Sequence, residues 1–324
     1  MSLKTEIIKR LETCEDGYTS GAALAKELSV SRTAVWKTIE SLRIEGFDIS
    51  ASTNRGYRLQ SGGDVLLQSA IEGFIKTSGV FRVEVRKSVS STNTALREIA
   101  GMGTQEGYVL VAEEQTDGKG RFGRKFHSPH GHGVYFSLLL RPNKNKTDAT
   151  LITSAAAVAA AQAIEQVFGI KAGIKWVNDL FIGDKKICGI LTEADYDMES
   201  GSISNAVLGI GINVTKPEEG FPDALAEIAC SLTDRVSGKD SERCRLIAAT
   251  LDRFWDFYID LSARKFLDEY RERSIVLGQD VYVISGDNRK PAHALELDDD
   301  CRLIVRYENN DIAALASGEV SVKV

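Results

Sequence analysis

Cysteine is scarce in this chain, and the few that occur do not have the spacing of a metal or redox site. The 324 residues contain five cysteines. They are scattered and odd in number, and no two are separated as in a Cys-x-x-Cys motif. Free thiols of this kind are typical of a reducing compartment. We therefore predict a cytoplasmic protein with unpaired cysteines.

Long hydrophobic runs are also missing. The longest apolar stretch, residues 151–163, is rich in alanine and is interrupted by Thr153, Ser154 and Gln162, so it is a poor transmembrane span. The first residues, MSLKTEIIKRLE, have the pattern of an amphipathic helix that contains acids, unlike a signal peptide. We expect no association with a membrane.

The chain has no excess of positive charge. Its net charge is −6, which argues against a globally basic nucleic-acid-binding protein. Residues 1–62 carry nine basic and eight acidic side chains, whereas the remainder carries 31 and 38. An acidic body is therefore attached to a near-neutral N-terminal module.

Several common catalytic motifs are absent. There is no GxxxxGK[ST] phosphate loop and no convincing Ser/His/Asp or Cys/His nucleophile set. Residues 118–123 match GxGxxG after a predicted strand, but a dinucleotide site also needs a helix to begin there. The chain instead continues as RKFHSPHG into another strand, which excludes that interpretation. The site is expected to act by positioning and electrostatic stabilisation rather than covalent catalysis.

The most distinctive stretch that is present is residues 118–133, GKGRFGRKFHSPHGHG, between two apolar segments. Glycines let the backbone approach a ligand closely. Free N–H groups and the cations Lys119, Arg121, Arg124 and Lys125 can together surround a phosphate or carboxylate. We predict a loop that closes over an anionic, nucleotide-like ligand.

Three of the four histidines, His127, His130 and His132, also lie in this stretch. A zinc site needs a fourth ligand held in fixed geometry. Without a nearby cysteine or other clear ligand, we favour histidines beside an anionic ligand over a zinc site.

The N-terminal module has the pattern of a winged helix. Helical periodicity covers residues 3–13, 22–28 and 34–45, with Ser20 and Ser31 as candidate caps. A short connection between the second and third helices predicts a helix-turn-helix at about residues 22–41. Residues 47–49 and 57–59 then alternate like a hairpin, the wing.

The third helix is the candidate DNA-binding element. It would present Ser31, Arg32, Thr33 and Lys37 outward, with Arg55 on the wing. Short hydroxyl and basic side chains near a helix N-terminus suit contacts to phosphates and base edges in the major groove. The alternative is a protein-docking module with a solvated basic face.

A linker at residues 61–64 precedes a series of strands and helices. Ser91, Thr92 and Asn93 lie at a strand-to-helix junction, where they could cap the helix or bind a ligand. Gln115 leads into the glycine-rich stretch, and Gly209 and Gly211 leave their strand open to close approach. The predicted elements are a helix at 66–77, strands at 83–88, 108–112 and 134–140, a buried helix at 149–168, and strands at 174–181, 186–194 and 206–214.

Two lysines, Lys175 and Lys186, lie on mostly apolar strands. Burying a lysine is costly unless it has an anionic partner. Lys175 therefore either serves an anionic ligand or is simply paired with Asp179. Asn178 and Asp179 could support this lysine or a metal ion.

The C-terminal part changes from helices to short strands. Residues 223–274 are predicted to be helical, with aromatic residues in the core. Five short strands follow, which predicts a small barrel. They are at residues 280–285, 292–297, 303–307, 313–315 and 320–324. The chain is thus an α+β protein with predicted domains at residues 1–62, 63–275 and 276–324.

Together, these patterns resemble the bifunctional biotin protein ligases of the biotin operon repressor type, over essentially the whole chain. The family's STN is Ser91-Thr92-Asn93, and its KxxGIL is intact at residues 186–191. A GIGxN-like strand ends at Asn213, and a GEISL-like stretch occupies residues 318–322.

Three positions depart from the family motifs. The glutamine followed by GRGRxGRxW appears as Gln115 and GKGRFGRKF, so Lys119 replaces an arginine and Phe126 a tryptophan. KWPND appears as KWVND, with Val177 in place of proline. Lysine lacks the bidentate fork of arginine, and phenylalanine keeps a stacking face without the indole donor.

The resemblance implies three domains: a winged helix-turn-helix, a mixed-sheet biotin/lipoate-ligase-like catalytic domain and an SH3-like β-barrel. It also implies a two-step reaction. Biotin carboxylate attacks the α-phosphate of MgATP to give biotinyl-5′-AMP and pyrophosphate, and a lysine of the biotin carboxyl carrier protein then attacks the mixed anhydride.

The resemblance further implies a role for each matching residue. Arg121 and Lys175 would be catalytic, and Mg²⁺ would enter with ATP, with Asp179 as the candidate residue near it. Biotin or its adenylate would be bound by Ser91, Thr92, Asn93, Gln115, Gly118, Lys119, Gly120, Arg121, Lys186 and Gly189. ATP would be bound by Arg124, Phe126, Asn178 and Asn213.

The implied partners are the carrier protein, operator DNA of biotin genes and a second copy of the chain. The adenylate would favour a homodimer that places two winged helices on the operator and represses transcription. Three alternatives stay open: a lipoate or octanoate protein ligase, a transcription factor whose core only senses a ligand, and a ligase whose winged helix no longer binds DNA.

Overall fold

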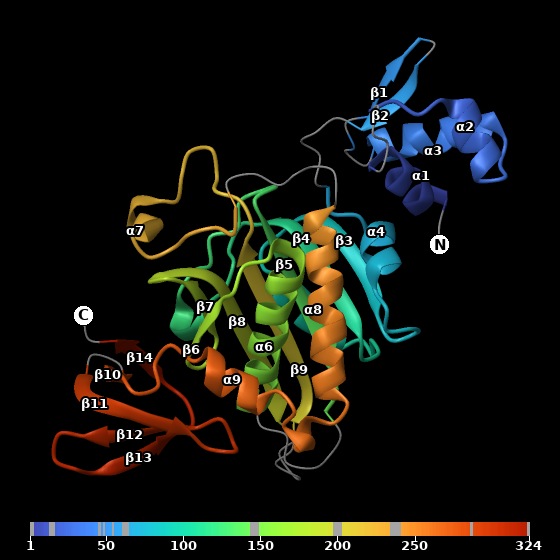
Figure 1. Ribbon diagram of the computed structural model, residues 1–324. Helices are drawn as coiled ribbons and strands as arrows, with labels where there is room; N and C mark the ends of the chain where they lie inside the picture. The colour runs from blue at the N-terminus through green and yellow to red at the C-terminus, as the bar shows by residue number, and fades with distance from the viewer. Residues whose placement is uncertain are drawn as a thin grey trace.

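The computed structural model describes residues 3–12, 17–44, 47, 49–53, 55–59, 65–142, 149–196, 203–233, 241–285 and 288–322. Figure 1 shows three units in chain order: a small helical unit with a two-stranded hairpin, a central sheet with helices, and a second sheet near the C-terminus. The predicted linker at residues 61–64 lies outside the described residues.

The N-terminal unit contains the predicted helices and wing. Ser20 Oγ accepts a hydrogen bond from Ala23 N, and Ser31 Oγ accepts one from Ala34 N, so both serines cap their helices as expected. Ile7, Leu24 and Ile39 are fully buried between the helices. The elements are α1 (Leu3–Glu12), α2 (Gly21–Glu27), α3 (Arg32–Ile44), β1 (Ile49–Ser52) and β2 (Gly56–Leu59).

The central sheet is mixed, as predicted. Its seven strands lie in the order β3-β4-β5-β9-β8-β7-β6, and β3 and β4 are parallel while the other neighbours are antiparallel. The strands are β3 (Arg82–Val89), β4 (Tyr108–Gln115), β5 (Gly133–Leu140), β6 (Gly173–Lys175), β7 (Asp179–Ile182), β8 (Lys185–Tyr196) and β9 (Ile203–Asn213).

Helices cover both faces of this sheet. Because side chains alternate along a strand, Leu110 of β4 packs with Leu96 of α5, whereas Val109 and Val111 belong to the larger core with α6 and α8. Figure 1 shows α6 and α8 side by side on that face. The helices are α4 (Gln68–Phe74), α5 (Thr92–Ala100), α6 (Ala149–Phe168), α7 (Asp223–Ala226), α8 (Glu242–Tyr258) and α9 (Leu267–Arg273).

Helix α6 is the one helix of the described residues that is long and apolar enough to cross a membrane. However, 72% of its apolar window is buried inside the structure. It is therefore the core helix of the central domain.

The C-terminal unit is a five-stranded antiparallel sheet, consistent with the SH3-like domain that we expected. Its order is β13-β12-β11-β10-β14. Figure 1 shows this sheet next to α9 and β6. The strands are β10 (Asp280–Ser285), β11 (Asn288–Leu297), β12 (Leu303–Tyr307), β13 (Ile312–Leu315) and β14 (Glu319–Val322).

Two predicted elements were wrong in detail. Residues 174–181 are not one strand: β6 ends at Lys175, the Trp176–Val177 peptide bond is cis, and β7 begins at Asp179. Lys175 and Asp179 thus face each other across a tight hairpin. Residues 223–274 are not continuously helical. Non-helical chain follows α7, and a short 3₁₀ turn, η2 (Leu261–Ala263), separates α8 from α9.

Candidate active site and DNA-binding surface

A pocket lies where the glycine-rich loop meets the middle of the central sheet. It is formed by the N-terminus of α5, the end of β4, and strands β8 and β9. Gly118 does not line it, but a side chain there would collide with the Phe126 carbonyl, so this glycine shapes the loop. The predicted residues that line the pocket are Ser91, Thr92, Asn93, Gln115, Lys119, Gly120, Arg121, Phe126, Asn178, Lys186 and Gly189.

The N-terminus of α5 is capped from another strand. Gln115 Oε1 accepts hydrogen bonds from Thr92 N (2.8 Å) and Thr92 Oγ1 (3.1 Å). Gln115 Nε2 donates to Ser128 Oγ (2.8 Å). Ser91 is the N-cap residue by position, but its side chain makes no capping bond. Gln115 therefore ties the STN segment to the loop, a link that sequence spacing did not reveal.

Asn93 is fixed against the floor of the pocket. Its Oδ1 accepts from Ser137 Oγ (2.6 Å), and its Nδ2 donates to Glu193 Oε2 (2.8 Å) and the Leu191 carbonyl (3.2 Å). A Cβ at Gly209 would collide with Asn93 Oδ1. The glycine is therefore required by this side chain, as well as by the ligand approach that we predicted.

Arg121 enters the site from the glycine-rich loop. Its Nη1 donates to Asn178 Oδ1 (3.1 Å) and to the Gly318 carbonyl (3.0 Å). Burial lowers the pKa of this guanidinium, although arginine stays charged in proteins. Within the described part of the chain Arg121 has no carboxylate partner at ion-pair distance. Neutral acceptors orient the group, and its charge is available to an anion.

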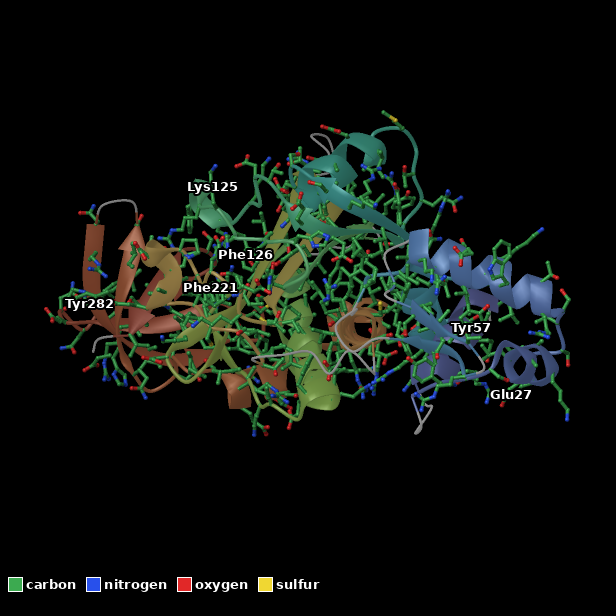
Figure 2. The ribbon with its side chains drawn as sticks, turned by 90° about the horizontal axis from the view of Figure 1, so that it is seen from above. Glu27, Tyr57, Lys125, Phe126, Phe221 and Tyr282 are labelled. Carbon is green, nitrogen blue, oxygen red and sulfur yellow. The ribbon has the colours of Figure 1, made fainter. Side chains whose placement is uncertain are left out.

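A second pocket adjoins the first and contains the predicted ATP residues. Arg124, Phe126, Asn178 and Asn213 all line it, together with Lys175. Sequence reasoning missed its other walls, which are Phe221, Leu225 and Ile228 around α7 and Gly318 and Glu319 at β14. Figure 2 labels Phe126 and Phe221 on this side of the molecule.

Phe126 lies between the two pockets and lines both. Its ring rests on β9, where a Cβ at Gly211 would come within 2.5 Å of it. Tyr135 contacts the ring edge-on, with centroids 6.4 Å apart. The absence of a side chain at Gly211 therefore leaves room for the Phe126 ring between the two pockets.

The structure decides which lysine pairs with Asp179. Lys186 Nζ lies 2.7 Å from Asp179 Oδ1, and Asn178 Nδ2 donates to the same oxygen. The alternative that Lys175 is simply paired with Asp179 is wrong. Lys175 Nζ lies 5.3 Å from the centre of the Phe181 ring, burial lowers its pKa, and it forms no ion pair with a described residue.

Two histidines of the loop, His127 and His132, are partly buried, whereas His130 is exposed. His127 lines the second pocket, and His132 Nδ1 lies 3.0 Å from Thr215 Oγ1. Burial lowers the pKa of both imidazoles. Across the residues that the structure describes, no three His, Cys, Asp or Glu side chains are grouped to hold a metal ion.

Helix α3 presents the predicted DNA-binding residues. Arg32, Thr33 and Lys37 are exposed, whereas Ser31 uses its hydroxyl to cap the helix. On the wing, the exposed Arg55 guanidinium lies 5.1 Å from the centre of the Tyr18 ring. We missed Trp36, which is 52% exposed on the same face. Its position four residues after Arg32 could have revealed it, because residues i and i+4 share a helix face.

Comparison with known proteins matches both parts of the chain. Residues 85–213 match the model of the biotin/lipoate A/B protein ligase family, and residues 4–58 match a helix-turn-helix domain model. The bifunctional ligase/repressor BirA of Bacillus subtilis is 38% identical over 266 residues, covering 82% of this chain and 81% of that protein. The protein of the same name from Escherichia coli is 32% identical over 197 residues, covering 61% and 60%.

Among solved structures, biotin protein ligase from Aquifex aeolicus in complex with biotin and ATP superimposes with a TM-score of 0.63. It is 28% identical and covers 75% of this chain and 98% of that one. Fold, pocket and matches together define a biotin protein ligase joined to a helix-turn-helix domain. The chain belongs to the family of bifunctional biotin ligase/repressor proteins. The lipoate ligase alternative is not favoured.

Proposed function

We propose that the chain forms biotinyl-5′-AMP from biotin and ATP, transfers biotin to a lysine of the biotin carboxyl carrier protein, and represses biotin genes in response to the adenylate. The observation that carries this proposal is Arg121 at the junction of two adjoining pockets, with its charge unpaired by any described carboxylate. An anion that spans both pockets, such as an acyl adenylate, would supply the missing partner.

In the first step, a biotin carboxylate oxygen attacks the α-phosphorus of ATP and pyrophosphate leaves. Both reactants are anions, so they repel each other unless cations lie between them. Arg121 and Lys119 would neutralise the carboxylate and the α-phosphate, and Lys175 would stabilise the charge that develops on the phosphate. Fixed charges in a partly buried site need little rearrangement during the reaction.

In the second step, the amine of the carrier lysine attacks the acyl carbon of the mixed anhydride. An amide bond forms, AMP leaves with the electron pair of the broken bond, and the amine loses a proton. Ser91, Thr92 and Gln115 would hold the biotin end, while Phe126, Asn178 and Asn213 would hold the nucleotide.

Asp179 is the candidate carboxylate for a magnesium ion. Its Oδ1 already bonds to Lys186 and Asn178, and its Oδ2 has no hydrogen bond to a described residue. Mg²⁺ in nucleotide sites is commonly held by one or two carboxylates, substrate phosphates and water, so one free oxygen fits. Such an ion would neutralise phosphate charge.

The repressor activity would couple the two ends of the chain. The adenylate would favour a homodimer, whose two α3 helices would bind two halves of an operator. Because coupling between sites is reciprocal, operator DNA would also tighten retention of the adenylate.

The direct test is to incubate the full chain with biotin, MgATP and a carrier domain, and to follow pyrophosphate release and the mass of the carrier. We expect pyrophosphate release with biotin and MgATP before any carrier is added, and a carrier mass increase equal to one biotinyl group once the carrier is present. Modification by lipoate and not by biotin would overturn the substrate assignment, and no pyrophosphate would favour a ligand sensor.

The DNA arm has its own test. Binding to biotin-operon promoter DNA is expected to weaken as salt rises and to strengthen with biotin and ATP. DNA binding that changes neither with salt nor with biotin and ATP would favour a winged helix that no longer acts as a repressor.

Trp36→Ala is expected to weaken operator binding by roughly tenfold, which corresponds to about 1.4 kcal/mol. The exposed ring would lose apolar contact with the major groove while the charge of α3 stays the same. The slope of affinity against salt should therefore not change, whereas Arg32→Ala should reduce that slope by about one. Affinity equal to that of the wild type would remove Trp36 from the DNA interface.

Glu319→Gln is expected to raise the KM for ATP by up to about fivefold with little loss of stability. Glu319 makes a two-pronged ion pair with Arg124 (2.7 and 2.9 Å), which holds the loop against β14, but Arg124 is 65% exposed. Exposed pairs contribute only about 0.2–1 kcal/mol. Steady-state kinetics at saturating biotin would measure the effect, and an increase above about fiftyfold would point to direct contact with the nucleotide.

A further inference from the structure

The turn between β11 and β12, residues 297–302, lies against the catalytic domain beside the KWVND segment. We call it the Asp turn, because it contains Asp298, Asp299 and Asp300. Trp176 Nε1 donates a hydrogen bond to the Cys301 carbonyl (2.9 Å). Trp176 is only 3% exposed and Cys301 is fully buried, so water cannot replace this contact.

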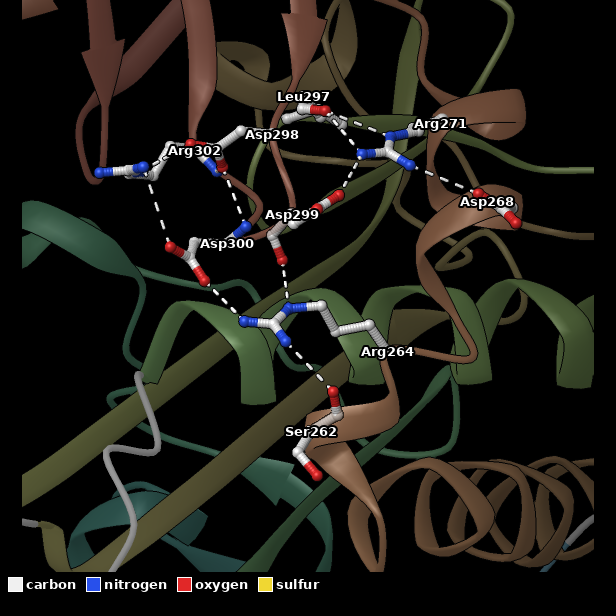
Figure 3. A network of polar contacts seen from close by, with 9 residues as sticks. All are labelled: Ser262, Arg264, Asp268, Arg271, Leu297, Asp298, Asp299, Asp300 and Arg302. Carbon is white, nitrogen blue, oxygen red and sulfur yellow. Dashed lines mark hydrogen bonds and ion pairs between the residues drawn. The ribbon is translucent and has the colours of Figure 1, made fainter.

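Two arginines of the catalytic domain hold the Asp turn in place (Figure 3). Arg264 donates from Nη2 to Asp300 Oδ1 (2.7 Å) and from Nε to the Asp299 carbonyl. Arg271 donates from Nε and Nη2 to the Leu297 carbonyl (3.2 and 3.0 Å). Most of these hydrogen bonds are accepted by backbone oxygens, so they hold the backbone of the turn in place in addition to neutralising its carboxylates.

The turn is also ordered from within. Asp298 Oδ1 accepts hydrogen bonds from the backbone N–H of Asp300 (3.0 Å) and of Arg302 (2.9 Å), and Arg302 Nε lies 2.6 Å from Asp298 Oδ2. Figure 3 shows this inner cluster beside the two arginines. These hydrogen bonds within the turn therefore hold the Cys301 carbonyl in position to accept the hydrogen bond from Trp176.

The KWVND segment is restrained on consecutive residues. Besides Trp176, the Val177 carbonyl accepts from the Tyr270 hydroxyl (3.1 Å), and Asn178 Nδ2 donates to the Ile190 carbonyl (3.0 Å). Lys175 precedes them and has no ion pair with a described residue to fix its ammonium group. The Phe181 ring lies 5.3 Å from this ammonium group, and the backbone of Lys175 is paired with that of Asp179 in the β6–β7 hairpin, so restraint of the residues that join the two strands contributes to its position.

We propose that Trp176 and the Asp turn are positioning elements for Lys175 and Asn178 during adenylate formation. The C-terminal sheet thereby contributes to the reaction through a backbone carbonyl, far along the chain from the residues that it positions. This inference rests on the proposed function, because it assigns Lys175 to the phosphate charge of that reaction. Trp176 lines the second pocket but not the first, and no residue of the Asp turn lines either pocket.

The test uses the full chain and follows pyrophosphate release with biotin and MgATP. Trp176→Phe keeps an aromatic ring but removes the N–H donor, so Lys175 and Asn178 lose one restraint. We expect kcat to fall about tenfold, since small displacements of positioned groups reduce rates by up to about a hundredfold. The KM for biotin should stay within about twofold, because the biotin wall of Ser91, Thr92 and Gln115 is untouched.

Two substitutions of Arg271 provide a second test of the same inference. Arg271→Ala removes both donors to Leu297, whereas Arg271→Lys keeps one positive donor, so kcat should fall in the first and recover partly in the second. Arg306→Ala is the matched control, because Arg306 is an exposed arginine of β12 in the same sheet. Its kcat should equal that of the wild type.

The outcomes separate this inference from the proposed function. If the wild type releases no pyrophosphate, the proposed function fails. If the wild type is active and both Trp176→Phe and Arg271→Ala retain its kcat, the positioning role is wrong. A loss of kcat accompanied by an equal loss of biotin affinity and a large fall in Tm would assign these residues a purely structural role, and would also overturn the inference.

Discussion

Arg121→Ala is expected to reduce the rate of biotinyl-5′-AMP formation by roughly 10²–10³-fold, about 2.7–4 kcal/mol of transition-state stabilisation. The guanidinium is half-buried and donates hydrogen bonds to two neutral oxygens, and it forms no ion pair with a carboxylate of the described residues. The fold should survive, because the variant loses two hydrogen bonds that contribute about 1 kcal/mol each. Any adenylate that forms should also leave the pocket faster.

The measurement is single-turnover adenylate formation, followed by filtration to time the loss of adenylate. Arg124→Ala is the comparison variant. This predicted ATP residue is on the same loop, but Glu319 already neutralises it, and the ion pair raises its pKa. Its effect should stay below about tenfold. If Arg121→Ala formed and retained adenylate as the wild type does, Arg121 would not be the catalytic cation.

Removing residues 1–62 is expected to abolish operator binding and to leave adenylate formation within about threefold of the full chain. The catalytic domain keeps the polar contacts at its N-terminal end. Leu66 N donates to Glu113 Oε1 (2.8 Å), and Arg243 Nη1 pairs with Glu113 Oε2 (2.9 Å). All three groups lie beyond the cut. The predicted domain boundary is thereby tested together with the separability of the two activities.

A deletion of residues 1–67 is the matched comparison. It also removes Leu66 and Leu67, which are buried, and takes away the N–H that satisfies Glu113. Burial of one leucine contributes about 1.5–3 kcal/mol, so this shorter chain should lose several kcal/mol of stability. Residual operator binding by the first deletion, or loss of ligation in it, would contradict separate domains. Both chains would be compared by DNA binding, pyrophosphate release and thermal unfolding.

The helices of the N-terminal unit were predictable because their determinants are local. Ser20 and Ser31 cap α2 and α3 within three residues of their partners. Ile7, Leu24 and Ile39 fall on the buried faces that the 3.6-residue period indicates. The same local reasoning failed at residues 174–181, where the polar pair Asn178 and Asp179 interrupts the apolar pattern at the hairpin and was predicted as part of one strand.

Most residues that line the first pocket were predictable, but the contacts between them were not. The residues of the STN, glycine-rich and KxxGIL segments were assigned through a family resemblance, and nearly all of them line the first pocket. Physical reasoning from the residues alone reached only an anion-binding loop and two costly lysines. Phe221 and Ile228 were missed because apolar side chains in a loop have no distinctive pattern.

Short-range sequence patterns were enough to predict the three kinds of unit, the caps of the N-terminal helices and the concentration of cations around residues 118–125. Tertiary structure alone decided that Lys186 pairs with Asp179, that Gln115 caps α5, and that Glu319 holds Arg124. The physical reason is range. Caps and helix faces are set by residues three or four positions apart, whereas Arg124 and Glu319 are 195 positions apart and are brought together only by the tertiary fold.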